Sequence, residues 1–127
     1  MAFHLDLKAI GYGFAVFIGG YGVMSFVASL TASVAESSPS KLGWILITVA
    51  GYLVPVIAGY VAAYFASARR ILNGTIGGTL GVLLMLVPAV FVPDYPFSGI
   101  PIVIASHGVL ASLGAIFGNH RRGKVGA

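Results

Sequence analysis

The feature that most constrains this chain is the length of its stretches without charge. Asp, Glu, Lys and Arg are absent from residues 9–35, 42–68, 71–93 and 95–120. A helix needs about 20 residues to cross about 30 Å of hydrocarbon, and each stretch exceeds that length. Because a backbone in lipid must satisfy its own hydrogen bonds, each stretch is predicted to be a helix rather than a strand.

The predicted fold is therefore an all-α, integral membrane bundle of four transmembrane helices. The sequence places these helices at about 9–33, 42–67, 72–92 and 100–118. The connections between them are short and leave no room for a second folded unit. We expect a single transmembrane domain that covers residues 1–127.

The shortage of charge excludes several classes of protein. Only 8% of the residues are charged, whereas a soluble domain carries roughly a quarter. So few charges cannot cover the water-facing surface of a globule, which excludes an ordinary soluble enzyme. The net charge of +4 arises from few charges on an apolar chain, so no nucleic-acid partner is expected. The chain contains no cysteine and offers no thiolate metal site.

Basic residues predict the orientation of the helices. Cytoplasmic loops of membrane proteins carry an excess of Lys and Arg. If both termini are cytoplasmic, Lys41 is the one basic residue on the outer side. The topology determinants on the cytoplasmic side are then Lys8, Arg69, Arg70, Arg121, Arg122 and Lys124. This pattern predicts a multi-pass protein of a prokaryotic cytoplasmic (inner) membrane, with both termini inside.

Small residues recur at helical spacing and predict close helix packing. Lipid tails are as apolar as leucine, so membrane helices associate where small side chains let the backbones approach. Pro55 lies mid-helix and should introduce a kink. The candidate packing residues are Gly11, Ala15 and Gly22, then Gly51 and Pro55, then Gly74, Gly78 and Gly81, and finally Ala111, Gly114 and Gly118. These faces can join the four helices to one another, or dock one of them on another subunit.

His107 is the polar residue that stands out within the predicted spans. It lies about 10 Å deep, seven residues into the fourth predicted helix. Three interpretations remain open: a neutral histidine bonded to a neighbouring helix, an axial ligand to haem or a chlorophyll-type macrocycle, or a proton relay. His4 and His120 lie at the membrane edge, too far away to ligate the same ring.

No catalytic constellation accompanies these features, so the chain is not expected to be an enzyme. The favoured hypothesis is an accessory or structural subunit of a larger membrane complex. The alternatives are a small homo-oligomeric pore or transporter lined by Ser, Thr and Tyr, and a pigment- or haem-binding subunit that uses His107. The expected partners are membrane lipid and either other membrane subunits or further copies of the chain.

Overall fold

The computed structural model describes residues 5–34, 41–91, 93–94 and 97–125, and the regular structure in this part of the chain is entirely helical. The prediction of an all-α fold with four helices is confirmed. The elements in chain order are α1 (Leu7–Val34), α2 (Lys41–Phe65), α3 (Arg70–Leu86), the 3₁₀ helices η1 (Val87–Phe91) and η2 (Phe97–Gly99), and α4 (Ile100–Val125).

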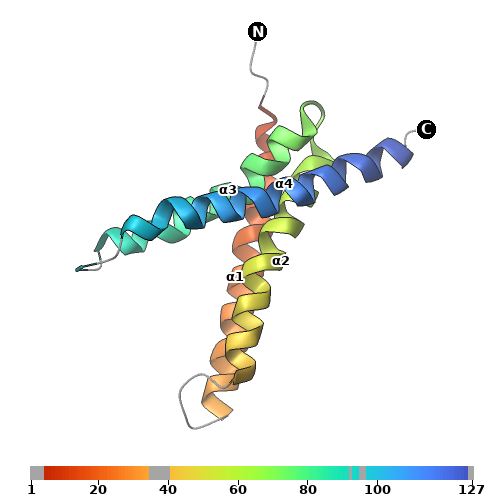
Figure 1. The fold of residues 1–127 in the computed structure, drawn as a ribbon. Coiled ribbons are helices and arrows are strands. Elements are labelled where there is room, and N and C mark those ends of the chain that lie inside the picture. The colour runs from red at the N-terminus through yellow and green to blue at the C-terminus, as the bar shows by residue number, and fades with distance from the viewer. Residues whose placement is uncertain (1–4, 35–40, 92, 95–96, 126–127) are drawn as a thin grey trace.

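The four helices form two hairpins that cross one another (Figure 1). α1 lies antiparallel to α2, and α3 lies antiparallel to α4. α2 packs against the three other helices, whereas no Cα of α1 lies within 8 Å of a Cα of α4 in the described residues. The start of α1, the α2–α3 connection and the end of α4 lie on one side of the crossing, and the far ends of both hairpins lie on the other (Figure 1).

Three of the helices are long and apolar enough to span a membrane. Their apolar segments are Leu7–Leu30, Gly43–Phe65 and Ile100–Lys124. α3 has only 17 residues, fewer than the roughly 20 that a span needs. The sequence predicted an unbroken helix over 72–92, so the structure differs at this point.

Pro88 explains why α3 ends early. Proline has no backbone N–H, so it cannot bond to the Leu84 carbonyl four residues before it. The N–H of Val87 bonds to that carbonyl instead, which is the spacing of a 3₁₀ turn. η1 then continues the chain in the tighter helix, and together α3 and η1 cover residues 70–91.

α4 ends at Val125, seven residues beyond the expected end at 118. The Nη1 atom of Arg122 donates hydrogen bonds to the carbonyls of Tyr64, at 2.7 Å, and Ala66, at 3.0 Å. A cation is favourable near the last carbonyls of a helix. The last turn of α4 therefore caps the end of α2 and holds the two helices together.

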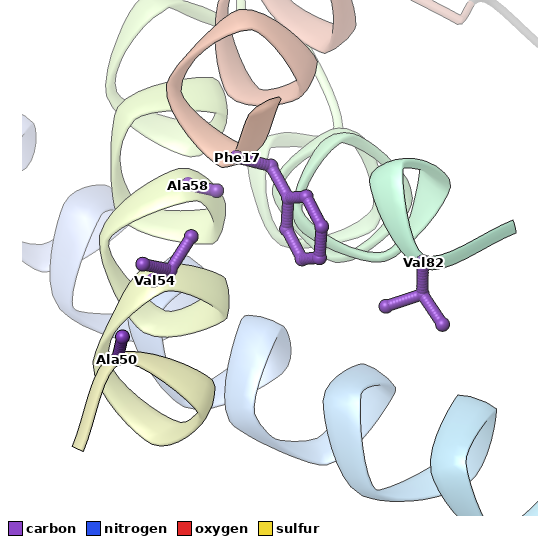
Figure 2. Packing of buried hydrophobic residues seen from close by; sticks show 5 residues of the cluster. All are labelled: Phe17, Ala50, Val54, Ala58 and Val82. Atoms are coloured by element: carbon purple, nitrogen blue, oxygen red, sulfur yellow. The ribbon is translucent and has the colours of Figure 1, made fainter. Parts of the chain in front are cut away.

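The core of the crossing is built on Phe17, whose ring is fully buried (Figure 2). The ring extends from α1 into the space between α2 and α3 (Figure 2). A Cβ at Gly81 of α3 would collide with this ring. The remaining buried members of the cluster are Ala50, Val54, Ala58 and Val82.

Glycines allow α2 and α4 to touch backbone to backbone. A Cβ at Gly114 would collide with the carbonyl oxygen of Val56, and one at Gly118 with that of Tyr60. These two glycines lie one turn apart on α4, as their carbonyl neighbours do on α2. Only glycine lets the backbones of α2 and α4 lie this close together. The register between the two helices is therefore fixed along a full turn.

Candidate functional site

The polar centre of the molecule is a hydrogen bond between His107 of α4 and Tyr21 of α1. The Tyr21 hydroxyl lies 3.2 Å from Nε2 of the imidazole. The other ring nitrogen, Nδ1, lies 2.8 Å from the carbonyl oxygen of Val103. A carbonyl only accepts, so in the neutral ring Nδ1 carries the hydrogen and Nε2 accepts from Tyr21. This bond joins two helices whose backbones do not approach one another.

Pro55 removes the helical donor of a carbonyl beside this bond. Its ring nitrogen has no hydrogen, so the Gly51 carbonyl lacks the donor that an unbroken α-helix would supply. The Tyr21 hydroxyl lies 3.4 Å from this carbonyl oxygen. Tyr21 has one hydrogen to donate, and the shorter distance is to His107. When Tyr21 donates to His107, the Gly51 carbonyl remains available to another donor.

A cavity of about 260 Å³ opens at this point between α2 and α4. The cavity is lined by Thr48, Gly51, Tyr52, Ser106, His107 and Leu110. The Thr48 hydroxyl donates to the Trp44 carbonyl at 2.8 Å, and the Ser106 hydroxyl donates to the Val103 carbonyl at 2.9 Å. These two hydroxyl hydrogens are already bonded, whereas the Tyr52 hydroxyl can donate or accept.

The hydrogen bond from Tyr21 and the size of the cavity both argue against a bound macrocycle on His107. The structure brings His107 next to a tyrosine hydroxyl, so a macrocycle on Nε2 would have to displace that hydroxyl. The cavity is also below the roughly 300–1,000 Å³ of most ligand sites. Among the residues that the structure describes, no three His, Asp or Glu side chains gather to hold a metal ion.

A second polar cluster lies where α1 begins, and it was not predicted from the sequence. The Asp6 carboxylate accepts hydrogen bonds from the Ser67 N–H at 2.9 Å, the Ser67 hydroxyl at 2.8 Å and the Ala9 N–H at 3.1 Å. The backbone N–H of Asp6 donates to Oδ1 of Asn73 at 3.0 Å. An Asp directly before an apolar helix is a typical N-cap, and this signal could have identified Asp6.

Asp6 makes the stability of this end of the fold dependent on pH. Hydrogen bonds from the backbone and side chain of Ser67, and then from Ala9, lower the pKa of Asp6 below its ordinary value of 3.8. A lowered folded-state pKa contributes stability above the ordinary value, and this is lost as the pH falls through the folded-state pKa. We expect the unfolding temperature in detergent to fall below about pH 4. The variant Asp6→Asn should show a smaller fall than the parent; an equal fall would contradict this assignment.

The basic residues that predict topology lie around the same end. Arg70 donates from Nε to the Ala66 carbonyl at 3.3 Å. Arg69 precedes α3 in the left-handed conformation, with φ of 43°. Arg121 and Lys124 are exposed on the last turns of α4, where Arg122 caps α2.

The structure separates the candidate packing residues into two groups. Most lie at contacts between helices of the chain: Gly51, Pro55, Gly74, Gly78, Gly81, Ala111, Gly114 and Gly118. In contrast, Gly11, Ala15 and Gly22 are exposed, and a Cβ at either glycine would meet no atom within 4 Å. Three further buried glycines at helix contacts were not predicted from the sequence, namely Gly13, Gly59 and Gly77.

An apolar groove of about 450 Å³ runs beside the exposed small residues of α1. Gly19 and Gly20 line it from α1, and Leu53 and Val54 from α2. Gly19 is itself exposed, with nothing within 4 Å of the place where its Cβ would be. The groove and the exposed face of α1 are therefore continuous.

Comparisons with protein families, with characterised proteins and with solved structures found no match to this chain.

Proposed function

We propose that the chain is a non-enzymatic membrane subunit that docks a helix of a larger membrane complex against α1. The observation that carries this proposal is the exposed small-residue face made by Gly11, Ala15, Gly19 and Gly22. These residues recur every three or four positions, so they share one side of α1. Small side chains let a second helix approach closely and pack along its length. Lipid tails do not pack against such a face as favourably.

The groove beside this face supports the same function. Its lining is apolar, and its volume of about 450 Å³ is sufficient for large side chains. A side chain inserted into a pocket next to a closely packed helix is the usual form of an interaction hot spot. A partner helix that carries Leu or Phe opposite the groove would thus complete the surface of the α1–α2 hairpin.

We further propose that both termini face the cytoplasm of a prokaryotic cell. The start of α1, the end of α4 and the α2–α3 connection lie on one side of the crossing (Figure 1), and the positive-inside rule assigns that side to the cytoplasm. α1 has 28 residues, which gives a length of about 42 Å. A tilt of about 40° fits such a helix to about 30 Å of hydrocarbon, and crossed hairpins supply a tilt of this kind.

The double variant Gly19→Leu with Gly22→Leu tests the docking face. Neither leucine Cβ meets an atom of the chain within 4 Å, so the variant should fold while its face is blocked. We expect at least a tenfold loss of the partner from the complex extracted gently from its own membrane, measured by native mass spectrometry.

Ala105→Leu is the matched control, because it enlarges an exposed small residue on α4 and should leave the complex intact. Equal retention of the partner by both variants would contradict docking on α1. A spectrum that contains only further copies of this chain would replace the accessory-subunit proposal by a homo-oligomeric pore or transporter.

A further inference from the structure

The crossing of the hairpins creates a place where an apolar molecule can meet a polar group inside the membrane. α2 and α4 touch at the crossing and diverge beyond it toward the far ends of the hairpins (Figure 1). The cavity lined by Thr48, Tyr52 and Ser106 lies between these two helices. Tyr52 is 61% exposed, so one wall of the cavity continues onto the outer surface of α2.

The hydrogen-bonding capacity of the cavity selects the ligand. The hydroxyl hydrogens of Thr48 and Ser106 are donated to their own helices, and Nδ1 of His107 donates to Val103. The Gly51 carbonyl lacks its helical donor because of Pro55, and Tyr21 can serve either this carbonyl or His107. The Tyr52 hydroxyl, which also lines the cavity, can donate or accept. A ligand that can both donate and accept a hydrogen bond, as an alcohol does, therefore fits this lining.

We propose that this cavity binds the hydroxyl end of a long-chain lipid alcohol, which donates to the carbonyl of Gly51. No Asp, Glu, Lys or Arg lies within the surrounding charge-free stretches, so a neutral donor fits better than an anionic headgroup. A single hydroxyl occupies little of the roughly 260 Å³, and the tail leaves between the diverging helices into the lipid. The site is separate from the groove beside Gly19, so it does not depend on the docking of a partner.

The test uses a photoreactive alcohol with a diazirine next to the hydroxyl, added to the full chain in lipid vesicles. Mass spectrometry should locate the label on 48–52 and 106–110. Octadecanol should displace it at about a fivefold lower mole fraction than methyl octadecyl ether, because the ether lacks the hydrogen for one bond. Labelling spread evenly over the lipid-facing surface, or equal displacement by both competitors, would overturn the proposal.

Two variants separate binding from damage to the fold. Pro55→Ala restores a helical N–H for the Gly51 carbonyl and should remove the preference for the alcohol over the ether. Tyr21→Phe removes the competing hydroxyl, so the preference should persist or increase, since Nε2 of His107 becomes a second acceptor. Loss of the preference in Tyr21→Phe, or its persistence in a folded Pro55→Ala variant, would overturn the assignment to this carbonyl.

Discussion

Gly114→Ala is expected to destabilise the fold by about 3 kcal/mol, a large effect for a single methyl group. The new Cβ would collide with the carbonyl oxygen of Val56 and would lie 3.0 Å from the backbone nitrogen of Tyr60. Both obstacles are backbone atoms of α2, so no side-chain rotation can relieve them. The two helices must separate, and the bonds from Arg122 to the end of α2 would be strained at the same time.

Gly108→Ala provides a control on the same helix. A Cβ at Gly108 has Thr79 Oγ1 as its nearest neighbour, at 3.9 Å, and alanine favours helix by up to about 1 kcal/mol over glycine. This variant should therefore be neutral or slightly stabilising. Reversible unfolding in mixed micelles of mild detergent and dodecyl sulfate measures both variants. Equal free energies of unfolding for the two would mean that the crossing of α2 and α4 is looser than described.

The helices themselves could be predicted from the sequence because the lipid environment constrains them strongly. A charge-free stretch of more than 20 residues has few alternatives to a helix in hydrocarbon. The ends were less predictable, because they depend on single interactions. Pro88 converts the end of α3 into a 3₁₀ turn, and Arg122 extends α4 by bonding to carbonyls that are 56 and 58 residues away.

The faces through which the helices pack could be predicted only in part. A helical wheel identifies small residues that share a side, but it does not show where a neighbour lies. Gly11 and Gly13 are equally small and only two residues apart, yet Gly11 is exposed while Gly13 is buried against Ala62. The crossing of the hairpins decides between them, and nothing in the local pattern encodes the crossing.

The candidate site was predicted as separate residues and not as a unit. His107 and Pro55 were singled out, one for its polarity and the other for its kink. Their connection runs through Tyr21, which is 86 positions from His107 in the sequence. Tyr21 is one of several Ser, Thr and Tyr residues within the predicted spans, so the sequence could not select it as the residue that joins both.

Asn73→Leu is expected to cost about 3 kcal/mol, although leucine is similar in size and suits a membrane helix. Asn73 is 0% exposed. Its Nδ2 donates to the Ala68 carbonyl at 2.8 Å, and its Oδ1 accepts from the N–H of Asp6 at 3.0 Å. Leucine would remove both hydrogen bonds of the buried amide and leave that carbonyl and that N–H, which are partly buried, without this partner; this loss exceeds the gain from an apolar side chain.

The same micelle titration measures the loss of stability in Asn73→Leu, and amide hydrogen exchange localises it. Exchange should accelerate at Asp6 and along the first turn of α1, while the core around Phe17 stays protected. Asn119→Leu is the control, because it makes the same substitution on α4 at an asparagine that is only partly buried. If both variants lose equal stability with no local change in exchange, Asn73 does not hold the start of α1 to the α2–α3 connection. The stability of that end would then depend on the carboxylate of Asp6 and its bonds to Ser67.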